Sequence, residues 1–363
     1  FRSSKRYGLE VDPNKKIEDI NVSLQQRVEI IKMLYREAEI LIFDEPTAVL
    51  TPQEVEFLLK IIEELRNGGK TIILITHKLE EVKKVADRCA ILNKGRLVSV
   101  LDVKDTSTKT MANLMVGREV SFEVAKKPST FGEVVLKVEN LWIRNQDNFD
   151  IVKGVSFNIR KGEIFAIAGV SGNGQIEIAD AIAGLRKISQ GNIYLNGKNI
   201  KDLTIRDRIE MGISYIPEDR QDVGLILDFS LAENLSLKDY YKKPFNENGF
   251  LNRKVINDYG AQLIEKYDIR SGQGIKTQVR SMSGGNQQKA IIGREIELES
   301  SLMIFVQPTR GLDIGAIENI QKMILEERDK GKAILLISLE LDEIMSISDT
   351  IGVIYNGEIL KIQ

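Results

Sequence analysis

The sequence predicts an α/β fold made of two related units, each built on a mostly parallel sheet. Three observations support this prediction. The hydrophobic stretch "EILIFDEPT" has a near copy, "SLMIFVQPT", later in the chain. Short apolar runs alternate with helical patterns throughout, which is typical of strands joined by crossover helices. The segment "GEIFAIAGVSGNGQ" (162–175) reads as a buried strand that breaks into a glycine-rich turn before a helix.

The repeat is long and free of gaps. An offset of 262 residues, which places Glu45 on Gln307, holds over about seventy-five residues. At this offset "TIILITHKLEEV" lies over "AILLISLELDEI". Further aligned pairs are Gln25 and Gln287, Pro46 and Pro308, Thr47 and Thr309, Asp87 and Asp349, and Gly95 and Gly357. We therefore expect one structural unit to occur twice.

The second unit extends further upstream than its copy. About 120 residues from Val134 onward have no counterpart ahead of "VSLQQRVEI", so the first unit is expected to lack its N-terminal part. The predicted organisation is the C-terminal part of a first domain (1–120), a short polar linker (121–133) and a complete second domain (134–363). Because the sequence opens at Phe1 without an initiator Met or a signal peptide, it is expected to be part of a longer chain.

Composition excludes several classes of protein. A length of 363 residues exceeds one ordinary domain, and a hydrophobic content of 42% can form a sizeable core. The net charge of −2 gives no sign of broad nucleic-acid binding. The longest apolar runs, such as "AILLISL", fall far below the ~20 residues that span a bilayer. One cysteine and one histidine exclude an internal disulfide and a zinc site with Cys and His ligands.

Residues 169–176, "GVSGNGQI", have the frame of a phosphate-binding loop, G-x-x-x-x-G-K-[ST]. Glycines let backbone N–H groups approach phosphates at the start of a helix. Gln175 stands at the lysine position and Ile176 at the Ser/Thr position, so the loop lacks a charge-assisted contact and a Mg²⁺ ligand. A glycine turn without any ligand is the alternative interpretation. The candidate nucleotide-binding residues are Gly169, Ser171, Gly172, Asn173, Gly174, Gln175 and Ile176.

A second candidate anion site lies in "SMSGGNQQK", where Ser283, Gly284 and Gly285 precede a helix expected to begin near Asn286. A hydroxyl and bare backbone amides at a helix start attract anions. A phosphate loop, this segment and a hydrophobic strand ending in "DEPT" together resemble the signature of ATP-binding cassettes. Over essentially its full length the chain resembles the cytoplasmic ATPase subunit of an ABC importer with two fused nucleotide-binding domains. The resemblance implies a P-loop NTPase fold of ABC type in two tandem domains, the first lacking its N-terminal part.

The resemblance also assigns roles to residues. Asp44 would hold Mg²⁺ through water, and Glu45 would orient or deprotonate the attacking water. His77 would contact the γ-phosphate of ATP, so ATP and Mg²⁺ are the implied cofactors. Gln287 would belong to the signature, and Asp313 would contact across the interface between domains. From the residues alone, Asp44 and Glu45 also suit a pair of solvated acids, and His77 a hydrogen-bonded structural histidine.

In ABC proteins two domains pair head to tail, so each nucleotide lies between the phosphate loop of one domain and the signature of the other. The first composite site would comprise Asp44, Glu45, His77 and the signature 283–287. The second would comprise 169–176, Val306, Gln307, Leu339 and residues 20–24, where Val22 and Ser23 replace two glycines. All visible losses fall on the second site. We therefore expect one site that hydrolyses ATP and one that does not.

The segments "VQPTRGLDIGAIE" and "IPEDRQDVGLI" resemble the branch of these importers that carries nucleosides rather than simple sugars. That branch works with lipoprotein receptors of the basic-membrane-protein type. The implied partners are two transmembrane permease subunits and an extracytoplasmic substrate-binding lipoprotein, with the chain peripheral on the cytoplasmic face of the membrane. Glu218 takes the place of the Gln-loop glutamine, near the groove for the permease. Residues 239–254 are interpreted as a permease-facing or solvated surface, and no nucleic-acid partner is expected.

Two alternatives remain at this point. A soluble two-domain ABC ATPase acting on the ribosome or on nucleic acid would have two intact acid pairs and a long charged linker, neither of which this sequence has. A regulator that binds nucleotide without hydrolysing it is favoured by the absence of a first phosphate loop. For the same reason, the chain as written is expected not to hydrolyse ATP by itself.

Overall fold

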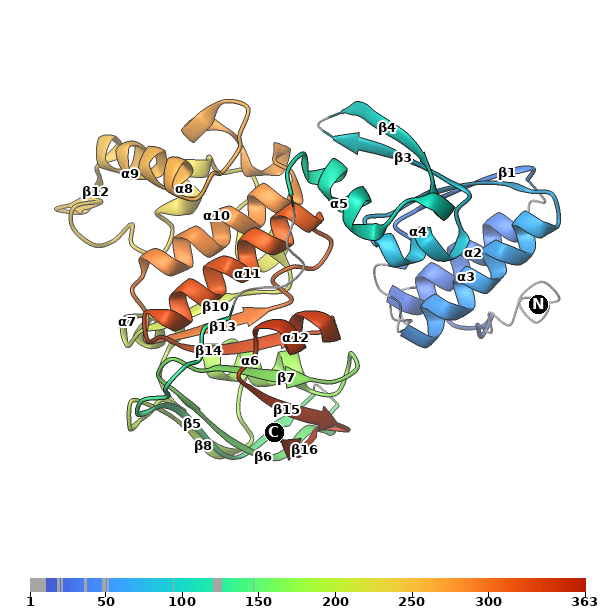
Figure 1. Ribbon diagram of the computed structural model, residues 1–363. Coiled ribbons are helices and arrows are strands. Elements are labelled where there is room, and N and C mark those ends of the chain that lie inside the picture. Colours follow the sequence, from blue (N-terminus) through green and yellow to red (C-terminus); the bar gives the residue numbers. More distant parts are fainter. Residues whose placement is uncertain are drawn as a thin grey trace. The chain divides into compact units, whose positions relative to one another are not determined.

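The computed structural model (Figure 1) describes residues 11–17, 20, 22–35, 38–47, 50, 52–93, 95–119, 126–145 and 147–363. The chain divides into two compact units. Unit 1 is Phe1–Ser121 with Asp313–Gly315, and unit 2 is Phe122–Leu312 with Ala316–Gln363. None of the helices in the described ranges combines the length and apolar character needed to cross a bilayer.

Unit 1 contains two short sheets and their helices. Strands β1 and β2 pair in parallel, with Asp44 opposite Ile75 at their carboxyl ends, whereas β3 and β4 form an antiparallel hairpin. In chain order the elements are α2 (Val22–Tyr35), β1 (Ile40–Asp44), α3 (Pro52–Asn67), β2 (Thr71–Ile75), α4 (Leu79–Val85), β3 (Arg88–Asn93), β4 (Arg96–Asp102), the short 3₁₀ helix Val103–Asp105 and α5 (Thr108–Val116).

Helices cover one face of the β1–β2 sheet. Leu41 and Phe43 of β1 are buried in a core with apolar side chains of α2, α3 and α4. The opposite face is apolar as well, because strand side chains alternate between faces. Its side chains are exposed: Ile40 and Ile42 at 60%, Ile73 and Ile75 at 48%. Within the described residues, unit 1 therefore buries only one face of this sheet.

Unit 2 contains the remaining elements. They are β5 (Val134–Arg144), β6 (Asp150–Arg160), β7 (Ile164–Ala168), α6 (Gln175–Ala183), β8 (Gln190–Leu195), β9 (Lys198–Asn199), α7 (Ile205–Glu210), β10 (Ile213–Ile216), a π-helical turn Arg220–Gly224, α8 (Leu231–Leu235), β11 (Asn246–Glu247), β12 (Phe250–Leu251), α9 (Arg253–Lys266), the 3₁₀ helices Gly274–Lys276 and Val279–Ser281, α10 (Gly284–Glu297), β13 (Leu302–Val306), α11 (Ile314–Asp329), β14 (Ala333–Ser338), α12 (Leu341–Ile347), β15 (Thr350–Tyr355) and β16 (Glu358–Ile362).

The main sheet of unit 2 has the strand order β10-β13-β14-β7-β15-β16. The first five strands are parallel, and β16 pairs with β15 in the antiparallel sense. A second, antiparallel sheet has the order β6-β5-β8-β9. The predicted α/β fold with a mostly parallel sheet is therefore confirmed.

Side chains of the central strand β14 alternate between two cores. Ala333, Leu335 and Ile337 lie in the core formed with α6 and the antiparallel sheet. Ile334 and Leu336 lie in the core formed with α10, α11 and α12. Figure 1 shows these two layers on opposite sides of the sheet. A strand buried on both faces has a continuous apolar run, which explains the sequence "AILLIS".

The repeat in the sequence is also visible in the element bounds. A shift of 262 residues carries the bounds of α2, β1, α3, α4 and β3 onto those of α10, β13, α11, α12 and β15. It carries β2 onto β14 apart from the last residue of β14. From α2 to β3, unit 1 thus repeats the elements of unit 2 from α10 to β15, one by one.

Two arrangements of charged side chains occur at matching places in the repeats, and the first is an arginine–aspartate pair. Arg66 lies 3.5 Å from Asp87 in unit 1, and Arg328 lies 3.2 Å from Asp349 in unit 2. The unit 2 pair is buried, with 1% and 6% of the side chains exposed, and Asp349 also accepts a hydrogen bond from the backbone N–H of Ile164 at the start of β7. The Asp87 side chain is 80% exposed.

The second feature is a buried carboxyl group. In unit 1, Glu81 accepts hydrogen bonds from the hydroxyl groups of Thr47 (2.6 Å) and Thr76 (3.3 Å), which joins the turns after β1 and β2. Its counterpart Glu343 is 4% exposed. Burial raises the pKa of Glu343 above its ordinary value, and the neighbouring polar side chains, Ser338 first among them, offset this only in part.

Replacing Asp349 with Asn should lower the free energy of unfolding of unit 2 by about 2 kcal/mol, because charge-assisted hydrogen bonds to a buried arginine are lost. Urea unfolding followed by circular dichroism measures the change. The matched control is Asp87→Asn, whose exposed side chain should contribute less than about 0.5 kcal/mol. Equal losses in the two variants would contradict the assignment of Asp349 as a buried anchor.

Replacing Glu343 with Gln should stabilise the protein at high pH only. The folded protein holds the Glu343 proton at higher pH than the unfolded chain does, so wild-type stability falls as the pH rises above the ordinary Glu pKa of about 4.3. The unfolding temperature of Glu343→Gln should therefore exceed that of wild type by about 2–4 °C at pH 8 and match it near pH 4. Glu358→Gln, at an exposed position, is the control. A benefit confined to acid pH would show that Glu343 is ionised in the folded state.

Candidate functional site

The glycine-rich loop of unit 2 joins buried strand β7 to helix α6, as the sequence predicts. Gly172 and Gly174 have φ angles of 88° and 102°, a region that favours glycine. A side chain at Gly169 is also excluded, because its Cβ would lie 2.7 Å from Ile354. The loop thus has the glycine geometry that brings backbone N–H groups to the start of a helix.

The loop carries amide side chains where a positive charge is usual. Gln175 is 4% exposed, and its Nε2 donates a hydrogen bond to the carbonyl of Val170 at 3.0 Å. Asn173 donates to the same carbonyl at 2.9 Å and accepts from the backbone N–H of Asn356 at 2.7 Å. Ile176 packs against the core, and Ser171 is exposed. The loop can offer backbone N–H groups to an anion, but its Lys and Ser/Thr positions supply neither an ammonium group nor a metal ligand.

The strand end of unit 2 has no acidic group. Val306, the last residue of β13, is fully buried, and Gln307 is 5% exposed. The backbone N–H of Gln307 donates to the carbonyl of Ile337 at 2.8 Å, and its side-chain Oε1 accepts from the N–H of Leu339 at 3.3 Å. Gln307 has a φ of 50°. Neither side chain carries a negative charge that could attract a metal ion, and neither can act as a base toward water.

The same backbone arrangement in unit 1 carries different chemistry. Glu45 has a φ of 45°, and its N–H donates to the carbonyl of Ile75 at 2.9 Å. Its carboxylate Oε1 lies 2.9 Å from Nδ1 of His77. Asp44, at the end of β1, is exposed. The structure therefore brings together the acid and the histidine that the sequence analysis assigned to catalysis.

Asp44 and Glu45 of unit 1 suit Mg²⁺, which needs few protein ligands, better than a metal ion that is coordinated by protein side chains alone. Among the described residues there is no group of three or more His, Cys, Asp or Glu side chains placed to hold a metal ion. Mg²⁺ usually takes one or two carboxylates and completes its shell with water and substrate phosphates. Asp44 is exposed and can serve as such a ligand.

The signature segment forms the start of α10. Ser283 is the N-cap residue, and its hydroxyl accepts a hydrogen bond from the side chain of Asn286 at 2.9 Å. Gly284 and Gly285 are partly exposed. Gln287 is 2% exposed, and its amide donates to the carbonyl of Val279 at 2.9 Å. Its side chain thus supports the segment from inside the unit.

Two arginines lie beside these elements, and the sequence analysis missed them. The guanidinium of Arg220 lies 3.0 Å from the point where a Cβ on Gly284 would be, and it also donates to the carbonyl of Arg310. Arg310 forms an ion pair with Glu218. Burial and the nearby Arg310 lower the pKa of Arg220. The loop that contains Glu218 is thereby tied both to the signature and to the turn after β13.

Asp313 and the segment 20–24 are the other residues predicted to contribute to sites between domains. Asp313 directly precedes α11 and is grouped with unit 1. Of the segment 20–24, Ile20 is buried, Asn21 lies outside the described residues, and the side chains of Val22 and Ser23 are likewise not described. The composite sites between domains therefore stay predictions.

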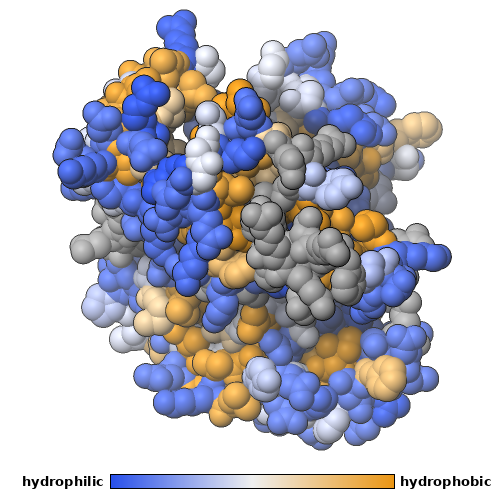
Figure 2. All heavy atoms as spheres, turned by 90° about the vertical axis from the view of Figure 1, so that its right-hand side faces the viewer, coloured by the Kyte–Doolittle hydropathy of each residue, from blue (hydrophilic) through white to orange (hydrophobic). Residues whose placement is uncertain are grey.

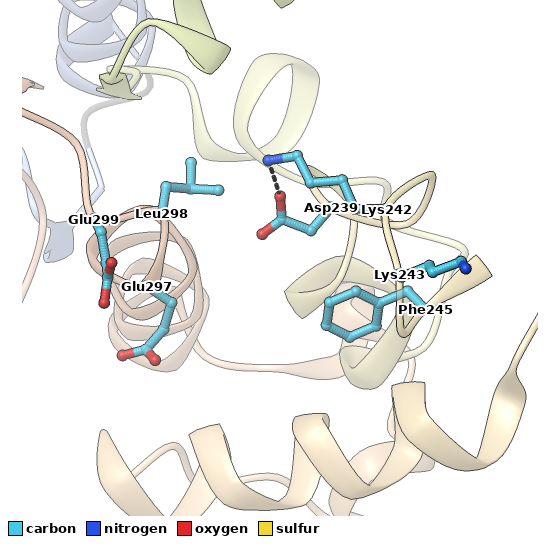
Figure 3. A pocket seen from close by; sticks show the side chains of 7 residues that line it. All are labelled: Asp239, Lys242, Lys243, Phe245, Glu297, Leu298 and Glu299. Carbon is cyan, nitrogen blue, oxygen red and sulfur yellow. Dashed lines mark ion pairs between the residues drawn. The ribbon is translucent and has the colours of Figure 1, made fainter. Parts of the chain in front are cut away.

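A cavity of about 240 Å³ lies away from these motifs, between the loop that follows α8 and the carboxyl end of α10 (Figure 3). It is lined by Asp239, Lys242, Lys243, Phe245, Glu297, Leu298 and Glu299. Lys242 and Asp239 form an ion pair at 2.7 Å, and Glu297 is bound by Lys266 at 2.6 Å. Much of the charge around the cavity is thus already paired within the protein.

Comparison with known structures supports the fold. The family model described as "ABC transporter" matches residues 152–310. A nucleotide-free ATP-binding cassette from an ABC transporter superposes with a TM-score of 0.54 at 23% identity, covering 63% of this chain and 91% of that one. A cassette in a dimeric post-hydrolysis state with ADP and phosphate gives 0.54 at 20% identity, covering 63% and 97%. The predicted P-loop fold of ABC type is thereby confirmed for one domain.

Sequence relatives extend over nearly the whole chain. A nucleoside import ATP-binding protein, NupA of Lactococcus lactis, is 49% identical over 356 residues, covering 98% of this chain and 70% of its own length. The guanosine import ATP-binding protein NupO of Bacillus subtilis is 50% identical over 357 residues, with the same coverage. A ribose import ATP-binding protein, RbsA of Clostridium tetani, is 38% identical over 355 residues, covering 97% and 68%. The chain therefore belongs to the ABC transporter family, among its import ATP-binding proteins.

Proposed function

We propose that the chain is the ATP-binding part of an importer for nucleosides and that it contributes one hydrolytic and one non-hydrolytic nucleotide site. Two relatives that are about half identical over 98% of the chain are named for nucleoside and guanosine import, and the sugar import relative cited above is more distant. The import proteins of this family work with membrane permeases and substrate-binding proteins. We extend this to two permease subunits and an extracytoplasmic lipoprotein, with the chain peripheral on the cytoplasmic side.

The observation that carries the proposal is the contrast between two equivalent strand ends. Both share the positive φ and the hydrogen bond to the neighbouring strand. In unit 1 the side chains are a carboxylate and a histidine 2.9 Å apart, whereas in unit 2 a glutamine contacts a backbone N–H. A carboxylate can accept a proton from water in the transition state, and an amide cannot.

In the hydrolytic site, Glu45 orients the attacking water and accepts a proton from it. His77 positions the Glu45 carboxylate, 2.9 Å away, and contacts the γ-phosphate of ATP. Asp44 would hold Mg²⁺ through water, and the bound ion would neutralise charge on the phosphates. The signature amides of Gly284 and Gly285, at the start of α10, bind phosphate oxygens with the positive end of the helix dipole. ATP is thus held between a catalytic strand end and a signature from different domains.

The non-hydrolytic site consists of the 169–176 loop and the Val306–Gln307 strand end. Its glycine geometry supports anion binding, while Gln175 and Val306 lack the charges that stabilise a transferring phosphate. Matching element bounds at an offset of 262 residues support the interpretation that the two strand ends come from two tandem domains of one type. The described part of unit 1 would then be the last part of the first domain.

The test measures Mg²⁺-dependent ATP hydrolysis by the assembled transporter, in which this chain is extended by the N-terminal part of the first domain. Glu45→Gln should lower the rate by about 100-fold or more, because a general base contributes about 10²–10⁴-fold. The matched change in the other repeat, Gln307→Glu, should leave the rate within about twofold, because that site also lacks the lysine and the metal acid.

Two results would contradict this proposal. Turnover that survives Glu45→Gln would remove the catalytic role from the unit 1 strand end. A large rise in rate with Gln307→Glu would show that the second site lacks only its base. Uptake of labelled guanosine and ribose by the same transporter separates the nucleoside from the sugar assignment.

A further inference from the structure

Arg220 is a half-buried cation that pairs with no carboxylate among the residues that the structure describes. Its Nη2 donates to the carbonyl of Arg310. The adjacent acid, Asp219, is occupied by its own backbone, because its carboxylate accepts from two N–H groups of the following turn at 2.8 and 2.9 Å. A guanidinium carries five N–H donors, so a single carbonyl leaves most of them without a partner in the described part of the protein.

Other buried arginines of unit 2 are better compensated. Arg328 lies 3.2 Å from the carboxylate of Asp349, and Arg294 lies 3.0 Å from that of Glu295. Arg208 donates to four backbone carbonyl groups. On the face that Figure 2 displays, hydrophilic residues lie at the surface, where water solvates their charges. Partial burial without a counter-ion therefore sets Arg220 apart from these residues.

The guanidinium of Arg220 lies beside the start of α10, where positive potential already gathers. Its Nη1 is 3.0 Å from the point that a Cβ on Gly284 would occupy, so a side chain there would press against it. Helix α10 is 14 residues long, and the N-terminal end of a helix carries a partial positive charge, which disfavours a second positive charge nearby. Burial, and after it the charge of Arg310, lower the pKa of Arg220. The protein by itself thus stabilises this cation poorly, and an anion at the start of α10 would compensate it.

We propose that Arg220 binds the terminal phosphate of ATP together with the backbone amides at the start of α10. The missing counter-ion is then the nucleotide. This role rests on the proposed function, in which ATP lies between the unit 1 strand end and the unit 2 signature. Hydrolysis takes place at the terminal phosphate, so this is the group that both halves of the site must reach.

A guanidinium suits this contact. It is planar and always charged at neutral pH, and its N–H groups match phosphate oxygens in geometry. The bond from Nη2 to the Arg310 carbonyl holds one arm, while Nη1 lies on the side of Gly284. Charge-assisted hydrogen bonds are about twice as strong as neutral ones. Because ADP lacks the terminal phosphate, the contact should favour ATP over ADP.

Steady-state hydrolysis by the assembled transporter tests the contact, since the KM for MgATP and the inhibition constant of ADP both report the site that turns over. Arg220→Gln keeps a donor for the Arg310 carbonyl but removes the charge. It should raise the KM for MgATP at least about 10-fold and leave the inhibition constant of ADP within about twofold. Arg220→Lys keeps the charge, so its KM should stay within about threefold of wild type.

The matched control is Arg280→Gln, close to the signature in sequence. Arg280 is exposed and forms an ion pair with Asp228 at 2.6 Å, so its loss should change the KM by less than about twofold. Three results would overturn the proposal: a KM for Arg220→Gln equal to that of the control, a KM for Arg220→Lys as high as that of Arg220→Gln, or equal losses of affinity for ATP and ADP.

A second measurement uses the chain by itself and does not depend on turnover. NMR titration with inorganic tripolyphosphate follows the backbone amides of Gly284 and Gly285 and the side-chain Nε–H of Arg220. We expect the three signals to shift together with one apparent Kd. Arg220→Gln should weaken binding at the two amides at least about fivefold, and Arg280→Gln should not. Signature signals that stay unchanged would overturn the proposal, whether or not the signals of the 169–176 loop shift.

Variants at Glu45 and Arg220 separate this inference from the proposed function. If Glu45→Gln abolishes turnover while Arg220→Gln behaves like Arg280→Gln, the hydrolytic role of the unit 1 strand end is supported and the Arg220 contact is wrong. If Arg220→Gln raises the KM while Glu45→Gln leaves turnover intact, the contact with ATP is supported and the catalytic role of the unit 1 strand end is wrong.

Discussion

A parallel sheet with apolar side chains on both sides is stable only when both faces are covered, and this constraint shapes the whole chain. Unit 2 meets it with helices α10 to α12 on one face and α6 with the antiparallel sheet on the other. Burial of each large aliphatic side chain contributes about 1.5–3 kcal/mol. Unit 1 has the same kinds of side chains at the same spacing, so it has the same requirement, but within its described residues only the helix face is covered.

The strand ends show how chemistry can change while the backbone does not. Glu45 and Gln307 share a left-handed φ and a hydrogen bond from their N–H to the neighbouring strand. Both therefore place a side chain of equal length next to an equivalent residue after the second strand of the pair, which is His77 in unit 1 and Leu339 in unit 2. Because the geometry is common to both, the two strand ends differ in side-chain chemistry: a carboxylate can accept a proton from water and an amide cannot.

Charged side chains with little exposure to solvent link several elements and loops of unit 2. Arg328 and Asp349 tie α11 to the start of β15 and β7, and Lys126 also reaches Asp349 at 2.9 Å. Near the signature, Arg220 and Arg310 link loops that are about 90 residues apart. A carboxylate or guanidinium withdrawn from water needs such partners.

By itself the sequence determined the fold class, the repeat and the position of each chemical motif. Apolar periodicity and glycine placement are local properties, so strands, helix starts and the glycine-rich loop could be predicted from neighbouring residues. The difference between the two strand ends was equally visible, because it consists of the residues themselves.

Tertiary structure alone decided which of these groups meet. The contact between Glu45 and His77 spans 32 residues, and those of Arg220 with Arg310 and Gly284 span 90 and 64. The burial of Gln287 and Gln175, which makes both amides internal supports, depends on side chains packed from other elements. Such facts arise from long-range packing, and a single sequence contains no direct signal for which distant residues share a surface.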